Sequence, residues 1–457
     1  MPPLPILLVG FAVVLGAIIV LRLHAFLALI AAAILVALLA PGEPAAKLAA
    51  VADGFGRTAG QLGVIVALAA IVGAAMSGSG ASDRIVRGFL DLLGERRGAQ
   101  ALGATAFVLS LPVFFDTIFF LLAPLARSMY RNTGRDYLKY LLAVSAGAVA
   151  THALVPPHPG PLAMASALGV DLGTMVLAGV VVALPSAAVG LLFAGWESRR
   201  MTVEVQPVAP GVSEEPPPAT LPGLVPSLAP VLLPVLLISA NTIVSTLRTA
   251  VPSGAATWDA LAAVTSVLGN PNVALFLAAG LALLLHWRAH PGAGRAELRR
   301  LVEGALLGAG AIVLIVGAGG AFGATLQLAD VGSLVRGALG RGAQGTGVAL
   351  LLVAFGVSVV LRTAQGSATV AMITTAGLIA AMLRGVTLPF HPVYIATAIA
   401  GGSLVGSWMN DAGFWVFSRV GGVSEADTLR SWTPLSAVVG TTAMVTTLLL
   451  ALLVPLR

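Results

Sequence analysis

The sequence predicts an all-α membrane protein built from two inverted repeats, on the basis of its charge content, its apolar segments and four recurring breaks. Of the 457 residues, 58% are hydrophobic and only 10% are charged, and the mean hydropathy is +0.98. Soluble proteins carry about 25% charged residues, so the 44 charged side chains present here are too few for a water-exposed surface of this size. The composition therefore argues against a soluble enzyme, a nucleic-acid-binding protein and a disordered scaffold.

Ten apolar segments are candidates for crossing the bilayer, whose hydrocarbon core of about 30 Å requires roughly 20 apolar residues per helix. Two further apolar stretches, 98–126 and 344–383, are interrupted near their middles. The ten segments cover residues 4–21, 24–40, 60–77, 140–169, 173–195, 224–248, 271–287, 304–328, 391–420 and 432–455. The chain is therefore expected to pass through the membrane many times.

Four of these apolar stretches are broken by prolines, glycines and polar groups. The breaks lie at 111–116 and 155–160 in the first half of the chain, and at 362–367 and 409–413 in the second half. In hydrocarbon, unpaired backbone is tolerated only where protein buries it or where it lines a watery cavity. The breaks are therefore expected to mark a functional region inside the membrane.

The breaks recur at similar spacing in the two halves. A Val-Arg-Gly tripeptide lies 30 residues before Asp116 and again 30 residues before Gln365, and the next break follows 42 and 46 residues later. Each half then consists of three helices, an interrupted hairpin, a broken helix and a closing helix. If the hairpins are re-entrant, each half crosses the membrane five times, and because five is odd the halves are inverted. Inverted repeats with broken helices are typical of secondary transporters.

The basic residues are distributed unequally between the two sides of the membrane that this topology defines. Seventeen of the 25 Lys and Arg residues fall on one side and seven on the other, while Arg362 stays within the membrane. The basic side is expected to be cytoplasmic, which places both termini on the outer, periplasmic side. If 98–126 crossed fully, the basic clusters at 84–97 and 127–139 would face opposite compartments, so the asymmetry favours a re-entrant hairpin.

One long polar stretch, residues 197–223, divides the chain. It contains Glu204, Glu214, Glu215 and three consecutive prolines, a composition typical of a disordered linker. The expected organisation is a first membrane repeat over residues 1–196, this hydrophilic linker, and a second, inverted membrane repeat over residues 224–457.

Charged side chains inside hydrocarbon cost about 2.5 kcal/mol or more, so each one is a candidate functional group. Two acids, Asp116 and Asp411, lie within apolar segments away from their ends. Asp116 lies among phenylalanines, where desolvation favours its neutral form and hence reversible protonation, or it caps the helix beginning at Thr117. Asp411 could likewise cap the half-helix at 413–420, and capping does not exclude ligand binding. Arg362 could bind a carboxylate bidentately or neutralise one of the two acids in a buried pair.

The second hairpin break also presents neutral donors and acceptors at alternating positions, from Thr363, Gln365, Ser367 and Thr369. Gly366 allows a close backbone approach among them. Such a set suits a polyhydroxylated ligand better than a bare ion, although the same groups could simply satisfy the backbone at an unwound turn.

Two histidines flank the proline-rich break. His158, between two prolines, is placed to line a cavity, and an imidazole titrates in the range useful for proton coupling. His152 is interpreted as a hydrogen-bonded packing residue. Their separation of six residues across prolines is not a metal-ligand pattern, so no metal site is expected.

At these motifs the sequence resembles the gluconate:proton symporter (GntP) family. The resemblance rests on LPVFFD at 111–116, THALVPPHPGP at 151–161, RTAQGSAT at 362–369 and NDAGFW at 410–415. The family takes up gluconate and related hydroxy-acids with protons across the bacterial inner membrane, and its wider superfamily is similar to elevator-type carriers with paired re-entrant hairpins. The resemblance thus implies that these four motifs form the substrate site. Related members often carry Ser where this chain has Ala412, so the choice among sugar acids stays open.

The expected function is proton-coupled uptake of gluconate or a related sugar acid. Arg362 and the neutral hairpin groups would hold the carboxylate and hydroxyls, with Asn410 and Asp411 on the opposite wall. Asp116, or else His158 or Asp411, would carry the proton. The expected partners are a small organic anion and membrane lipid, with the proton as coupling ion and no cofactor. Such carriers are often dimers, which makes a homodimer a further expectation.

Alternatives remain within transport and outside it. Carbonyls at broken helices can bind Na⁺, so sodium coupling stays open, as does another short hydroxy-carboxylate such as glycerate. A passive anion channel would not need paired hairpins. An intramembrane enzyme would need a catalytic set, and the chain shows none clearly; it contains no Cys, which excludes thiolate metal sites and cysteine catalysis.

Overall fold

The computed structural model describes residues 3–21, 23–94, 97–201, 203, 221–250, 256–291, 295–329, 343–383, 386–409 and 411–456. Throughout these residues the regular structure is helical, without a β-strand, which confirms the expected all-α class for this part of the chain. Seven of the described helices are long and apolar enough to cross a membrane. Most of the expected linker, residues 204–220, and the second Val-Arg-Gly tripeptide, at 335–337, lie outside the described residues.

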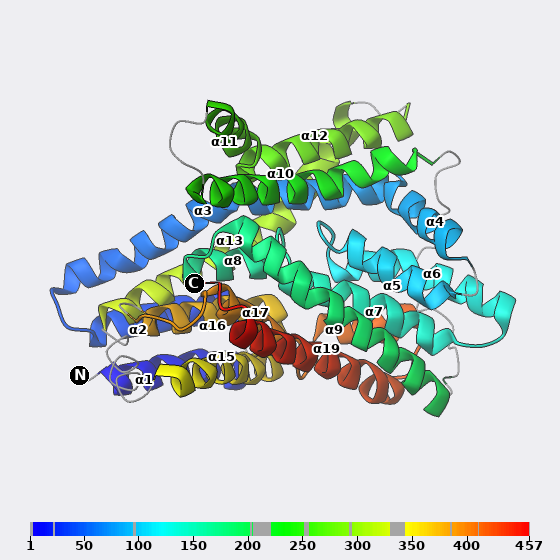
Figure 1. The fold of residues 1–457 in the computed structure, drawn as a ribbon. Helices are drawn as coiled ribbons and strands as arrows, with labels where there is room; N and C mark the ends of the chain where they lie inside the picture. Colours follow the sequence, from blue (N-terminus) through cyan, green and yellow to red (C-terminus); the bar gives the residue numbers. More distant parts are fainter. Residues whose placement is uncertain are drawn as a thin grey trace.

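The first half contains nine helices in its described part (Figure 1), and α1 continues into a π-helical turn at Gly16–Val20. They are α1 (Pro3–Leu15), α2 (Ala25–Leu39), α3 (Pro44–Gly78), α4 (Ala81–Leu93), α5 (Gly98–Leu109), α6 (Phe115–Thr133), α7 (Tyr137–Leu154), α8 (Pro159–Leu168) and α9 (Leu172–Arg200). The expected crossing at 60–77 is thus the second half of a much longer helix, α3. The short helix α4 lies outside the expected crossings because its charged residues interrupt the apolar pattern.

The second half likewise contains nine helices among its described residues. They are α10 (Leu224–Ala250), α11 (Ala256–Leu268), α12 (Pro271–Ala289), α13 (Arg295–Leu328), α15 (Ala343–Gln365), α16 (Ala368–Met382), α17 (Val393–Leu404), α18 (Ala412–Gly421) and α19 (Glu425–Leu453). The helix α11 was not expected. Both α13 and α19 begin earlier than the apolar segments that predict them, because their first turns carry charged residues.

Each of the four expected breaks interrupts a helix, between α5 and α6, α7 and α8, α15 and α16, and α17 and α18. The proline break ends α7, and Pro159 then occupies the first turn of α8, where a missing N–H costs nothing. Gly366 and Gly406 adopt φ angles of +75° and +82°, which glycine tolerates without strain. Because Gly406 turns the chain early, the last break begins at Val405, before the expected 409–413.

Two packing arrangements position these breaks. The long helices α3 and α13 pack against each other in opposite directions: Gly54 lies against Ala321 and Ala324, whereas Gly63, further along α3, faces the earlier Val313. The second arrangement centres on α7 and α17, in which nearly every residue is buried. The helices α5 and α9 pack on α7, and α15 and α19 pack on α17.

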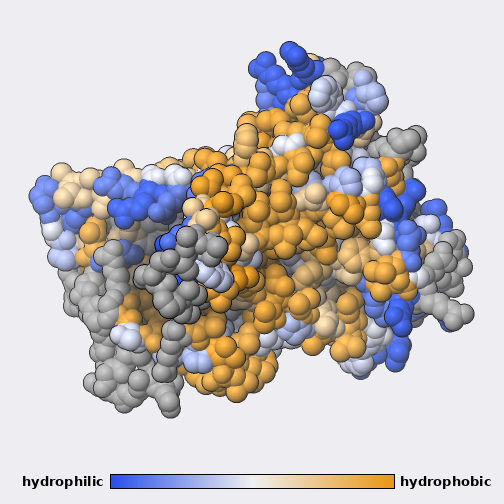
Figure 2. All heavy atoms as spheres, turned by 45° about the horizontal axis from the view of Figure 1, so that its top comes forward, coloured by the Kyte–Doolittle hydropathy of each residue, from blue (hydrophilic) through white to orange (hydrophobic). Residues whose placement is uncertain are grey.

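The surface is suited to a lipid environment. Figure 2 shows a broad hydrophobic face with hydrophilic residues gathered at its margins. Large apolar side chains such as Leu192, Phe276 and Leu307 are exposed to the surroundings of the molecule. Contiguous apolar surface of this extent is not found on soluble monomers, so the described helices form a multi-pass membrane protein.

Candidate functional site

Three of the four breaks meet at a cavity of about 230 Å³. The start of α6 contributes Phe114 to Asp116, the end of α15 contributes Arg362, and the start of α18 contributes Asp411. Ser367 and Thr369, at the beginning of α16, complete the polar lining. The breaks thus bring together side chains that lie almost 300 residues apart in the chain.

A buried ion pair joins two of these breaks. The Arg362 Nη2 donates to Oδ2 of Asp411, and the two side chains are only 6% and 11% exposed. The Arg362 Nη1 donates to the Gly366 carbonyl within its own break. Of the alternatives that the sequence leaves open for Arg362, the structure shows the pair with Asp411. In the described part of the chain, Nε of Arg362 is buried without a hydrogen-bond partner.

Asp411 also caps a helix and receives a hydroxyl. Its Oδ1 accepts a hydrogen bond of 3.0 Å from the Gly413 N–H and so caps α18. Its Oδ2 accepts from Ser407 Oγ, which in turn accepts from the indole N–H of Trp432 at 2.7 Å. Capping and ion pairing therefore coexist at this carboxylate, which accepts from three donors: Arg362, Ser407 and the Gly413 N–H.

Asp116 is arranged differently. It lies in the first turn of α6 and faces the cavity, but the residue that caps α6 is Phe114, without a side-chain hydrogen bond. Within the described residues, Asp116 makes no hydrogen bond or ion pair. The cavity therefore contains one carboxylate that is neutralised by Arg362 and a second one that is available to a proton or a ligand.

His152 and His158 differ in how they lie relative to the cavity. His152 lines the cavity, and its Nδ1 has no hydrogen-bond partner among the described residues. His158 is 3% exposed and lies behind Phe114, its Nε2 donating to the Ser110 carbonyl at 2.6 Å. The two rings are 4.2 Å apart between centroids. In this structure His152, interpreted from sequence as a packing residue, is therefore the histidine next to the cavity.

The remaining predicted site residues fall into three groups. Ser367 and Thr369 line the cavity, and Ser367 Oγ caps α16 by accepting from the Val370 N–H at 3.3 Å. Thr363 is exposed outside the lining, and its carbonyl accepts from the Trp408 indole at 2.9 Å. Asn410 and the side chain of Gln365 lie outside the described residues.

Two residues that support Asp411 are not predicted by the motifs: Trp432, which lines the cavity, and Ser407, which lies outside its lining. Trp432 is 2% exposed and packs against Phe115, with ring centroids 5.0 Å apart, while Ser407 links it to Asp411. A signal for this region exists at the start of α19, where Ser424 Oγ accepts from the Asp427 N–H and donates to its carboxylate. This capping pattern starts α19 at Glu425 and so places Trp432 two turns inside the helix.

Known proteins resemble this chain over nearly its whole length. The model of the GntP family permeases matches residues 2–453. A gluconate permease of Pseudomonas aeruginosa is 35% identical, covering 94% of this chain and 93% of that protein. A low-affinity gluconate transporter of Escherichia coli K12 is 32% identical, covering 92% of each. Among solved structures, Neisseria gonorrhoeae MtrF, of a class of antimetabolite efflux pumps, has a similar fold, with a TM-score of 0.61 at 15% identity over 90% of this chain and 85% of that one.

Proposed function

This chain belongs to the GntP family of permeases, and from that premise we propose that it takes up gluconate or a related sugar acid together with protons. As a member of this family it is a transporter rather than an enzyme, and it is a multi-pass inner-membrane protein. The names of its relatives support a sugar-acid substrate: besides the gluconate permeases, an L-idonate transporter of Escherichia coli is 29% identical.

The main support for proton coupling is the balance of charges in the cavity. Arg362 and Asp411 neutralise each other, which leaves the unpaired carboxylate of Asp116. Asp116 is exposed in the cavity, and a carboxylate anion bound there would bring a second negative charge beside it, which like-charge repulsion opposes. Protonation of Asp116 removes that repulsion. Anion and proton are therefore expected to enter together, and the neutral pair is expected to leave together.

The donors of the cavity support recognition of a hydroxylated carboxylate. A guanidinium carries five N–H groups in a planar fork, and the described contacts of Arg362 use Nη1 and Nη2 once each while Nε has no partner. The unused edge is suited to a substrate carboxylate. The hydroxyls of Ser367 and Thr369 lie in the same lining and suit the hydroxyl groups. In this arrangement Asp411 orients Arg362.

We extend the proposal to two inverted repeats that move as an elevator. The antiparallel packing of α3 and α13 supports the inversion. Residues 250 positions apart correspond in the two helices, so that Gly54 matches Gly304 and Gly73 matches Gly323. Gly54 and Gly323 line one cavity between the helices, and their counterparts Gly304 and Gly73 line another, as an inverted repeat requires. Gly63 faces its own equivalent, Val313, near the centre of the pair. The hairpins and broken helices would then form the moving part, and α3 with α13 would belong to the static part.

The predicted orientation and dimer belong to the same proposal. In Figure 1 the N-terminal end of α1 and the C-terminal end of α19 both point to the left, while the ends of α4, α6 and α9, which adjoin basic clusters, point to the right. This arrangement supports termini on the periplasmic side and basic ends in the cytoplasm. A homodimer remains a prediction from the family resemblance.

Uptake into proteoliposomes tests the function. Radiolabelled gluconate should accumulate inside vesicles under an inwardly directed proton gradient and not under a sodium gradient alone. Unlabelled gluconate and idonate should compete more strongly than glycerate, which offers fewer hydroxyls. Accumulation that requires sodium would show that sodium, and not the proton, is the coupling ion. Flux that equilibrates without accumulating would indicate a passive channel. If glycerate competes most strongly, the preferred substrate is a short hydroxy-acid such as glycerate and not a sugar acid.

A further inference from the structure

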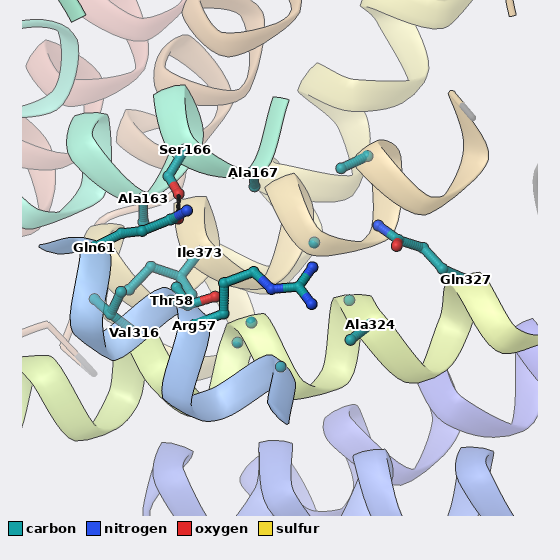
Figure 3. A pocket seen from close by; sticks show the side chains of 16 residues that line it. Arg57, Thr58, Gln61, Ala163, Ser166, Ala167, Val316, Ala324, Gln327 and Ile373 are labelled. Atoms are coloured by element: carbon teal, nitrogen blue, oxygen red, sulfur yellow. Dashed lines mark hydrogen bonds between the residues drawn. The ribbon is translucent and has the colours of Figure 1, made fainter. Parts of the chain in front are cut away.

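A second polar cavity, shown in Figure 3, has a volume of about 200 Å³ and shares none of the described lining residues of the central site. It is enclosed by α3 and α13 on one side and by α8 and α16 on the other. Among the residues that the structure describes, its lining includes one cation, Arg57, four neutral polar side chains, from Thr58, Gln61, Ser166 and Gln327, and no acidic residue.

The polar groups of this cavity face one another. In Figure 3 the guanidinium of Arg57 reaches into the space, and Gln327 extends toward the same space from α13. Within the described part of the chain Arg57 forms no ion pair. The carboxamide oxygen of Gln61 accepts a hydrogen bond of 2.9 Å from Ser166 Oγ, which leaves the Gln61 amide N–H groups as donors. The cavity thus offers a net positive charge surrounded by hydrogen-bonding groups.

A matched cavity elsewhere in the molecule shows that helix packing alone does not produce this chemistry. A third cavity, of about 410 Å³, lies between the opposite halves of α3 and α13, beside the break between α5 and α6. Under the 250-residue correspondence, the positions of Arg57 and Gln61 are occupied by Leu307 and Ala311. Those of Thr58 and Gln327 correspond to Gly308 and Ser77, which line the third cavity. The same pair of helices therefore forms a polar cavity at one end and a largely apolar one at the other.

We propose that the Arg57 cavity is a second binding site for a hydroxy-carboxylate anion of the transported class. A carboxylate would pair with Arg57, and the substrate hydroxyls would bond to Gln61, Gln327 and Thr58. This inference rests on the proposed function, because it takes the substrate class from it. On the predicted orientation, the site lies on the periplasmic side.

Two helices connect this site to the central one. Ala368 and Thr369 at the start of α16 line the central cavity, and Ile373, Gly377 and Ala380 further along line the Arg57 cavity. Similarly, α8 begins after His158 and reaches the Arg57 cavity at Ser166. The second site therefore lies along the same helices, a few turns from the first, where it can hold an anion before the central site accepts it.

Cysteine protection tests the site, and the absence of native Cys makes each introduced thiol unique. Ala167 is exposed and lines the cavity, whereas Ala52 is exposed on α3 outside its lining. The Ala167→Cys and Ala52→Cys proteins, in lipid nanodiscs, are treated with a methanethiosulfonate reagent with and without gluconate. At about ten times the dissociation constant, gluconate should slow labelling of Ala167→Cys about tenfold by occupancy and leave Ala52→Cys unchanged.

Substitutions at the two sites, each combined with Ala167→Cys, distinguish gluconate bound in the Arg57 cavity from a movement of the protein caused by gluconate bound at the central site. Protection of Ala167→Cys should persist with Arg362→Gln/Asp411→Asn, which leaves no unpaired buried charge at the central site, and disappear with Arg57→Gln, and Arg57→Lys should restore it in part. Protection that disappears with the double substitution, or that persists with Arg57→Gln, would overturn the second site, as would no protection at all. Gluconate uptake by Ala167→Cys is measured in parallel, so intact uptake without protection refutes the second site alone, whereas absent uptake by the unmodified chain refutes the proposed function.

Discussion

Arg362 and Asp411 form a buried ion pair although 49 residues separate them and they belong to different helix breaks. The pair fixes the second hairpin to the break between α17 and α18. It also decides which acid of the cavity is neutralised and which is left to titrate.

Breaking the ion pair from one side should destabilise the protein and abolish uptake. Arg362→Gln leaves the buried Asp411 uncompensated, a change that typically costs about 3–5 kcal/mol. The double variant Arg362→Gln/Asp411→Asn should regain part of the lost thermal stability, because neither charge is then unpaired, but it should not regain uptake. Thermal unfolding and uptake in proteoliposomes are the measurements.

The matched control for that pair is the exposed Arg299–Glu303 pair of α13, with an Nε–Oε1 distance of 2.7 Å. Exposed pairs contribute little to stability, so Glu303→Gln should change neither unfolding nor uptake. A double variant that is as active as the unmodified chain would show that Arg362 does not bind the substrate.

Trp432 should affect substrate affinity through Ser407. The substitution Trp432→Phe keeps an aromatic ring against Phe115 but removes the indole N–H that donates to Ser407 Oγ. A lost buried hydrogen bond costs about 1 kcal/mol, so the apparent KM for uptake should rise about fivefold. Trp196→Phe, on the exposed part of α9, should leave KM unchanged. An unchanged KM in Trp432→Phe would show that this hydrogen bond does not position Asp411.

Close helix packing should be needed where α16 meets α13. A Cβ on Gly377 would lie 3.2 Å from the Gly319 carbonyl oxygen and 3.6 Å from Cα of Gly323, whereas a Cβ on Gly310 would meet nothing within 4 Å. Alanine is favoured over glycine in a helix by about 1 kcal/mol, so Gly310→Ala should be neutral or stabilising. Gly377→Ala should slow uptake at saturating substrate, because it separates the two helices. Equal rates for the two variants would show that this contact does not restrict movement.

The four breaks were predictable because prolines, glycines and polar groups are conspicuous within apolar sequence. Unpaired backbone is tolerated in lipid only where protein buries it or where it lines a cavity. The partner of Arg362 was not predictable, because Asp116 and Asp411 are equivalent acids in sequence and only the fold shows which one approaches the guanidinium. Trp432 was missed for a related reason: an aromatic residue at the start of an apolar segment is typical of a membrane surface.

The second cavity was hidden by the extent of α3. Hydropathy predicts a crossing at 60–77, but the helix begins at Pro44 and its first half carries Lys47, Asp53 and Arg57. These charges lower the hydropathy of the segment, so the sequence pattern assigns them to a loop. Packing against α13 holds the segment in the helix, and it places Arg57 beside α8 and α16.

The central claim is that Asp116 carries the coupled proton, and the Asp116→Asn variant tests it most directly. An amide keeps the shape of the side chain and mimics the protonated acid, but it cannot release a proton. We predict that this variant loses accumulation of gluconate driven by a proton gradient, while exchange of labelled for unlabelled gluconate across the membrane continues. Intact accumulation driven by the proton gradient in Asp116→Asn would contradict the account.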